Sequence, residues 1–120
     1  MNKKTVVLGA SENPDRYSNM AVKKLTAHGH EVIAIGKRMG KIDGIEIHKT
    51  PPQVDNVDTV TLYLNPTHQA AYYDYICALH PKRIIFNPGA ENRELEKIAE
   101  NQGIETREAC TLVMLSTGQY

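Results

Sequence analysis

The chain has 120 residues, of which 41% are hydrophobic, and this predicts one domain spanning residues 1–120 with one core. Lys plus Arg and Asp plus Glu each number 14, so the net charge is zero, which argues against a nucleic-acid-binding protein but leaves room for a local basic site. The sequence contains no apolar run long enough for a transmembrane helix, so we expect no membrane partner.

The cysteines and histidines indicate no metal site. Cys77 and Cys110 are too far apart for a metal or redox motif, and the histidines form no zinc-like cluster with them. Two cysteines without such a pattern are typical of a reducing compartment, so we expect a cytoplasmic protein.

The first half of the chain alternates short apolar runs with a helical pattern. Ala21, Val22 and Leu25 share one helix face, and Gly29 follows as a stop signal. We predict strands at residues 5–9, 31–36 and 45–48, a helix at 19–28, and a polar, glycine-rich loop at 37–44.

The second half repeats this alternation. We predict strands at residues 58–64, 83–87 and 104–107, and helices from 65 to about 79 and from 91 to 102; residues 109–115 fit either a helix or a strand. The order predicts an α/β fold in three layers, doubly wound, with a mostly parallel sheet of about five strands. Ligands bind such folds beyond the carboxyl ends of the strands, where the strand order reverses.

The segment after the first predicted strand, "GASENPDRYSN", has the features of an anion site. Gly9 permits a tight turn, and the helix that follows offers free backbone N–H groups and a partial positive charge. A dinucleotide fingerprint needs glycine at positions 9, 11 and 14, but only the first is present, which weakens an NAD interpretation. Singly, the later polar residues could also be simple helix caps or solvated side chains. The candidate residues of this segment are Gly9, Ala10, Ser11, Arg16, Ser18 and Asn19.

The second predicted strand ends in Gly36, Lys37 and Arg38. An NAD site would place a carboxylate here to bind the ribose hydroxyls. Two cations instead suit a ribose that carries an extra phosphate, as in NADP or coenzyme A, although a basic pair can also be a solvated loop.

Two later strands end in Asn-Pro. Asn65 is suited to the N-cap of a helix with Pro66 in its first position, and the run after the other strand is suited to a turn. Both would border the same crevice, and we predict that they form its walls through Leu64, Asn65, Pro66, Asn87, Pro88 and Gly89.

No catalytic set is evident. Ser11 lacks a nucleophile-elbow sequence, and His68 has no identifiable carboxylate partner. Cys110 could be a reactive thiol, but an unpaired cysteine in "ACTLVML" is more typical of a core. We therefore expect a binding module more than an enzyme.

Three segments together resemble the single-domain coenzyme A-binding protein family, a Rossmann-like group similar to the CoA-binding domain of succinyl-CoA ligase alpha subunits. They are "VVLGASENPDRYSNMAVKKLTAHGHEVIAIGKR", "VDTVTLYLNP" and "RIIFNPGAENRELEKIAENQGIETREACTLVM". The resemblance implies a crevice for the ADP part of coenzyme A. The loop after the first strand would take the diphosphate, and Lys37 and Arg38 would take the 3′-phosphate. The family often has Asn-Pro before the basic residue, where this chain has Ile35-Gly36.

Three functions follow as hypotheses. The first is binding of coenzyme A or an acyl-CoA without catalysis, since the related ligases carry their catalytic histidine in a further domain that this sequence lacks. The second is an NADP-linked reductase or sensor, and the third is an interaction module with a degenerate nucleotide pocket. The sequence does not distinguish a monomer from a homodimer.

Overall fold

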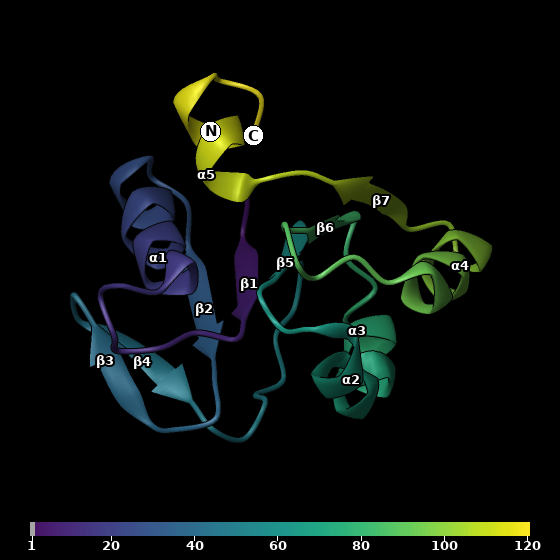
Figure 1. The fold of residues 1–120 in the computed structure, drawn as a ribbon, viewed down its shortest axis with the longest axis horizontal. Coiled ribbons are helices and arrows are strands. Elements are labelled where there is room, and N and C mark those ends of the chain that lie inside the picture. The colour runs from purple at the N-terminus through teal and green to yellow at the C-terminus, as the bar shows by residue number, and fades with distance from the viewer. Residues whose placement is uncertain (1) are drawn as a thin grey trace.

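A computed structural model describes residues 2–120 as three layers, with helices on both faces of one twisted sheet (Figure 1). The strands are β1 (Thr5–Leu8), β2 (Val32–Ile35), β3 (Gly40–Ile42), β4 (Ile45–His48), β5 (Thr59–Leu62), β6 (Arg83–Phe86) and β7 (Glu105–Glu108). The helices are α1 (Tyr17–Ala27), α2 (Pro66–Gln69), α3 (Tyr73–Leu79), α4 (Arg93–Asn101) and α5 (Thr111–Ser116), with a 3-10 turn at Ala70–Tyr72.

The sheet has the order β3-β4-β2-β1-β5-β6-β7, and only the β3–β4 pair is antiparallel. The predicted α/β architecture is confirmed, but the prediction of about five strands is wrong, because the sheet has seven. The missed strand, β3, lies within the predicted loop 37–44. It is an edge strand that buries only Ile42, so it has no run of apolar residues to reveal it.

The strand order reverses between β1 and its neighbours. The chain moves from β1 to β2 on one side of the sheet and later returns to β5 on the other side, with β1 paired in parallel to both. The carboxyl ends of β1 and β5 therefore border the crevice expected of a doubly wound sheet.

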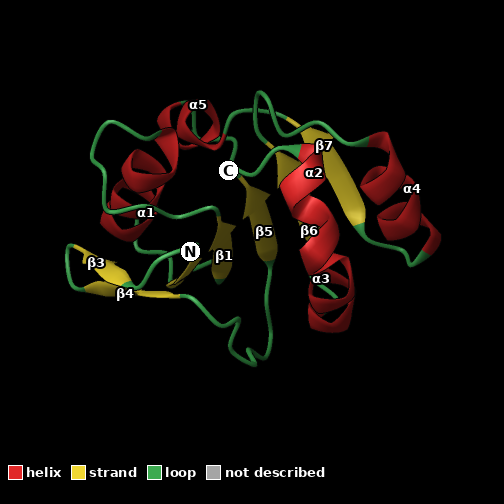
Figure 2. Cartoon of the chain, turned by 60° about the horizontal axis from the view of Figure 1, so that its bottom comes forward, coloured by secondary structure: helices red, strands yellow, loops and turns green. Residues whose placement is uncertain are grey.

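Two apolar clusters cover the two faces of the sheet. Helices α1 and α5 pack on one face, with Val22, Leu25 and Leu115 in that cluster. Helices α3 and α4 pack on the other through Ile76 and Leu95 (Figure 2). Burial of these side chains is the main stabilising contribution, at roughly 1.5–3 kcal/mol for each large one.

Helix boundaries shift by a few residues from the predicted ones. Helix α1 begins at Tyr17 rather than at residue 19, and α4 begins at Arg93 because the Asn92 side chain accepts hydrogen bonds from the amides of Glu94 and Leu95. The predicted helix 65–79 is broken by the 3-10 turn. The ambiguous segment 109–115 forms the short helix α5. No helix within residues 2–120 combines the length and apolarity that a membrane crossing requires.

Asn87 connects three elements in the interior. Its Nδ2 donates to Thr61 Oγ1 at 2.7 Å and to the Leu62 carbonyl at 2.8 Å, and its Oδ1 accepts from the Thr111 amide at 2.9 Å. The side chain is almost fully buried. Asn87 thus joins the end of β6 to β5 and to the start of α5.

We predict that Asn87→Ala lowers the free energy of unfolding by about 3 kcal/mol, because it leaves buried donors and acceptors without partners. Urea unfolding followed by circular dichroism measures the change. The matched variant Asn101→Ala, at an exposed position, is expected to stay within about 0.5 kcal/mol of the unmodified protein. A similar loss in both variants would contradict the role given to Asn87.

His30 lies just before β2, at the edge of the sheet where the parallel strands begin. Its Nδ1 accepts from the Lys3 amide at 2.9 Å, and its ring centroid lies 5.0 Å from that of Tyr120. Burial lowers the pKa of His30, and nearby positive charges, including those of Lys3 and Arg83, lower it further. The folded protein therefore favours the neutral imidazole.

A histidine with a lowered pKa binds fewer protons when folded than when unfolded, so it makes stability fall as the pH drops below its unfolded value. We predict that His30→Asn, which retains an acceptor, flattens the dependence of unfolding free energy on pH between about pH 5 and 7. Chemical denaturation across this range is the measurement. An undiminished slope, equal to that of the exposed-site variant His80→Asn, would refute the assignment.

Candidate functional site at the carboxyl ends of β1 and β5

A hollow of about 730 Å³ lies where the strand order reverses. Its wall comes from the loop after β1, the start of α1, the loop after β2, and the segment after β5. The lining residues are Gly9, Ala10, Ser11, Glu12, Asn13, Arg16, Tyr17, Ser18, Lys37, Arg38, Met39, Tyr63, Leu64, Asn65, His68 and Pro88. This volume is in the range of small-molecule and cofactor sites.

The loop after β1 is fixed by backbone contacts with β2. The amides of Gly9 and Ala10 both donate to the Ile35 carbonyl at 2.9 Å. Gly9 has a φ of +100°, and a Cβ there would lie 3.1 Å from the Tyr63 carbonyl carbon. Only glycine adopts this conformation without strain, so the turn needs no further glycine.

Beyond Gly9 the loop is stabilised by its own polar groups. The Asn13 amide donates to Ser11 Oγ, and Asn13 Oδ1 accepts from the Asp15 amide at 3.0 Å. Asn19, buried on α1, donates from Nδ2 to the Ser11 carbonyl at 2.8 Å. The long excursion is therefore an ordered loop that extends over the carboxyl end of β1.

The start of α1 opens toward the hollow. Arg16 occupies the N-cap position with no side-chain capping bond, and the first turn contains no acidic residue. Within residues 2–120, the amides of Tyr17 and Ser18 have no hydrogen-bond acceptor. Unpaired amides at the start of an 11-residue helix attract an anion.

The side chains around the hollow carry an excess of positive charge. Arg16, Lys37 and Arg38 are exposed and form no ion pair with any residue from 2 to 120. Glu12 is the one acidic lining residue in this part of the chain, and its Oε2 accepts from the Lys41 amide at 2.9 Å. The Glu12 carboxylate is thus held against β3.

The hollow also has apolar surfaces. Tyr17 and Met39 line it while remaining 69% and 71% exposed, which is unusual for large apolar side chains. Tyr63 lies deeper, and burial raises the pKa of its hydroxyl well above the ordinary value. The Tyr63 hydroxyl is buried close to Thr61 and Thr111 but forms no hydrogen bond of normal geometry within residues 2–120.

The structure brings most of the predicted site residues to this hollow. Those that line it are Gly9, Ala10, Ser11, Arg16, Ser18, Lys37, Arg38, Leu64, Asn65 and Pro88. His68, considered only as an acid or base, also lines it, whereas Cys110 does not. Whether these residues bind a ligand stays a prediction.

Five predicted site residues do not line the hollow; they are Asn19, Gly36, Pro66, Asn87 and Gly89. Asn19 and Asn87 are turned inward and hold the loops in place, and Gly36 lies where the end of β2 packs against the backbone of Ala10. Asn65 is an N-cap as predicted, because its Oδ1 accepts from the His68 amide at 3.0 Å.

The sequence interpretation missed Glu12, Asn13, Tyr17, Met39 and Tyr63. Tyr63 follows directly after the end of β5, where a search of strand ends could have found it. Met39 gave no such signal, because its position depends on the unpredicted strand β3.

A family model described as "CoA binding domain" matches residues 3–116. The chain belongs to this family. No curated protein matches it.

Solved structures share the fold of this chain. A crystal structure of an uncharacterized protein is 49% identical, with a TM-score of 0.97, and the match covers 100% of this chain and 99% of that chain. A conserved hypothetical protein from Pyrococcus furiosus is 26% identical, with a TM-score of 0.73, over 88% of this chain and 91% of that chain. A hypothetical protein from Pyrococcus horikoshii OT3 is 24% identical, with a TM-score of 0.87, over 96% of this chain and 82% of that chain, and shows the shared fold. The seven-stranded, mostly parallel sheet with flanking helices is consistent with a Rossmann-like domain.

Two glycines that lie against the loop after β1, Gly36 and Gly40, allow a direct test of the contacts that hold this loop. A Cβ on Gly36 would lie 2.3 Å from the Ala10 carbonyl oxygen, whereas a Cβ on Gly40 would lie 2.3 Å from the Glu12 side chain. The Ala10 backbone cannot move aside, whereas the flexible Glu12 side chain can. The same substitution at the two glycines therefore differs only in whether backbone or side chain must move, which makes them a matched pair.

We predict that Gly36→Ala lowers unfolding free energy by about 2–3 kcal/mol and that Gly40→Ala lowers it by less than about 1 kcal/mol. Urea unfolding measures both. Equal losses would mean that the contact between the β2 end and the loop after β1 is not tight in solution.

Proposed function

We propose that this protein binds coenzyme A, or an acyl-CoA, through its adenosine 3′-phosphate 5′-diphosphate part, as a single-domain module without catalysis of its own. The observation that carries the proposal is the hollow where the strand order reverses, with free amides of α1 on one side and Lys37 and Arg38 on the other. Membership of the CoA-binding family supports the class of ligand.

The diphosphate fits the wall made by the loop after β1 and the start of α1. The amides of Tyr17 and Ser18 have no other acceptor in residues 2–120, and Arg16 is free to add a charge-assisted contact. Ser11 lines the same wall. Because these donors belong to an ordered loop, little ordering free energy is lost on binding.

The 3′-phosphate fits the loop after β2. Lys37 and Arg38 lie there, and the nearby Glu12 carboxylate is engaged by the Lys41 amide rather than by either cation. An adenine ring can pack against the apolar surfaces of Tyr17 and Met39 at the rim. Leu64, Asn65 and Pro88 on the far wall are left for the pantetheine arm.

The lack of catalysis is part of the proposal. His68 is exposed at the rim, and no carboxylate of residues 2–120 pairs with it to orient its ring. The backbone amide of His68 donates to Asn65 Oδ1, which caps the start of α2. The arrangement therefore favours binding of a nucleotide over turnover of a substrate.

We predict that the protein binds coenzyme A about tenfold more tightly than 3′-dephospho-coenzyme A, because only the former presents a phosphate to Lys37 and Arg38. Isothermal titration calorimetry at physiological ionic strength is the measurement. The double variant Lys37→Ala, Arg38→Ala should bind both molecules with about the affinity that the unmodified protein has for 3′-dephospho-coenzyme A. The variant Arg93→Ala, Lys97→Ala removes the same charge from exposed positions on α4 and should preserve the preference.

Two outcomes would redirect the proposal. Tighter binding of NADPH than of coenzyme A, seen in the fluorescence of the reduced nicotinamide, would favour an NADP-linked sensor, since the basic pair also suits a 2′-phosphate. No binding of any nucleotide, with a protein partner retained equally by the Lys37→Ala, Arg38→Ala variant, would favour an interaction module. The absence of Trp makes excess absorbance near 260 nm a direct sign of a copurified nucleotide, and mass spectrometry would identify it.

A further inference from the structure

Glu12 makes an unexpected contact for an acidic side chain in a hollow lined by cations. It is exposed on the loop after β1, and its Oε2 accepts from the amide of Lys41 on β3 at 2.9 Å. It forms no ion pair with any residue from 2 to 120, although it lines the hollow together with Arg16 and Lys37. The carboxylate is therefore used to bind a backbone amide and not to neutralise a cation.

The Glu12 side chain also packs against the backbone of β3. A Cβ on Gly40 would lie 2.3 Å from Glu12 Cδ and 2.6 Å from its Cγ, so the side chain lies directly over Gly40. β3 is an edge strand of three residues that pairs with β4. The outward amides of an edge strand have no neighbouring strand to accept from them, and Glu12 supplies that acceptor for Lys41. Glu12 thus fastens this edge of the sheet to the loop after β1.

The segment that contains the two cations, residues 37–39, lies between two contacts with the loop after β1. Before the segment, Gly36 packs against the carbonyl oxygen of Ala10. After the segment, Gly40 packs against the side chain of Glu12. The loop after β1 also leads to the start of α1, where the free amides lie. The place of the segment relative to those amides is therefore set at one end by Ala10 and at the other end by Glu12.

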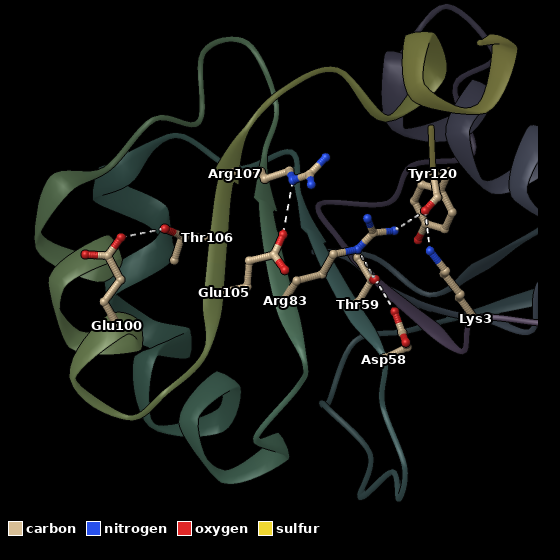
Figure 3. Close-up of polar contacts among 9 residues, drawn as sticks. All are labelled: Lys3, Asp58, Thr59, Arg83, Glu100, Glu105, Thr106, Arg107 and Tyr120. Carbon is tan, nitrogen blue, oxygen red and sulfur yellow. Dashed lines mark hydrogen bonds and ion pairs between the residues drawn. The ribbon is translucent and has the colours of Figure 1, made fainter. Parts of the chain in front are cut away.

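Two cations elsewhere in the protein are held by contacts of their own side chains. Where the parallel strands begin, Lys3 and Arg83 both donate to the main-chain oxygen of Tyr120 (Figure 3). Lys37 and Arg38, in contrast, are exposed and form no ion pair within residues 2–120. Their place in the site depends on the backbone of their loop, and hence on the contacts at its two ends.

We propose that Glu12 is a positioning residue of the nucleotide site: its carboxylate fixes the β3 edge and so holds Lys37 and Arg38 where they meet the 3′-phosphate. The proposal rests on the function proposed above and identifies the residue that orders the phosphate-binding segment before the ligand arrives. Conformational entropy that is already lost in the free protein is not lost again on binding. A carboxylate beside a bound phosphate repels it, and this cost is offset by the order that Glu12 gives to the segment.

Two substitutions separate the hydrogen-bond acceptor of Glu12 from its charge. Glu12→Gln and Glu12→Ala both remove the negative charge, but only the glutamine keeps an oxygen that can accept from the Lys41 amide. We expect Glu12→Ala to bind coenzyme A about fivefold more weakly than Glu12→Gln does, because the cations on the loosened segment must be ordered on binding. The affinities of the two variants for 3′-dephospho-coenzyme A should differ by less than about twofold, since this molecule lacks the phosphate that the segment binds. Isothermal titration calorimetry measures all four affinities.

Gly40→Ala tests the same contact without a change of charge. The added Cβ would displace the Glu12 side chain, so we expect the preference for coenzyme A over 3′-dephospho-coenzyme A to shrink, as in Glu12→Ala. Glu46 provides the matched control, since it is an exposed carboxylate on β4, opposite Lys41, and does not line the hollow. Glu46→Ala and Glu46→Gln should bind coenzyme A with equal affinity.

Amide hydrogen exchange in the free protein tests the contact without a ligand. The Lys41 amide should exchange faster in Glu12→Ala than in Glu12→Gln, because only the glutamine still accepts from it. The amides of β1 should exchange at the same rate in both variants, since the contact lies at the edge of the sheet.

The outcomes separate the role of Glu12 from the function on which it rests. If the unmodified protein shows no preference for coenzyme A over 3′-dephospho-coenzyme A, both proposals are overturned. If it shows the preference, and Glu12→Ala and Glu12→Gln retain it equally, only the role of Glu12 is overturned. Faster exchange throughout β1 in Glu12→Ala would also overturn that role, because the effect would then be a general loss of stability.

Discussion

The contact on which the rest of the structure depends is the one between the end of β2 and the turn after β1. One carbonyl, that of Ile35, accepts from the amides of both Gly9 and Ala10. The two strand ends come so close that any side chain on Gly36 would overlap the Ala10 carbonyl oxygen. This contact sets the direction in which the chain leaves the sheet, and hence where the long loop and the start of α1 lie. The hollow exists because that loop passes over β1 rather than away from it.

The same constraint explains how a site can form with one glycine where a dinucleotide site uses three. The turn itself needs only the left-handed conformation of Gly9. Ser11, Asn13 and Asn19 then stabilise the remainder of the loop with hydrogen bonds, so that α1 begins beyond it with its amides free. Under the proposed function, the backbone donors would recognise a phosphate group in general, whereas the cations of the loop after β2 would distinguish one phosphorylated ribose from another.

Side chains of the same type have different roles at different positions in this structure. Asn65 and Asn87 both precede a proline at the end of a strand, yet Asn65 is exposed and caps a helix, while Asn87 is buried and joins three elements. Likewise, Arg38 is a solvent-exposed cation at the carboxyl edge, and Arg83 is a buried one at the amino edge. The local sequence is nearly the same around Asn65 and Asn87, and it is uninformative around Arg38 and Arg83. The surroundings of each side chain in the folded protein decide its role.

By itself, the sequence determined the alternation of strands and helices, the parallel sheet, and the segments that would meet at its carboxyl edge. These follow from local patterns: apolar runs, helix periodicity, and the conformations available to Gly9 and to Asn65-Pro66. The tertiary structure decided the strand β3, the inward orientation of Asn19 and Asn87, the contribution of Tyr63 and Met39 to the hollow, and the contacts of the buried Arg83 with Thr59 and Tyr120. Each of these depends on contacts between residues far apart in the chain, and local propensity contains no information about which distant group a side chain will meet.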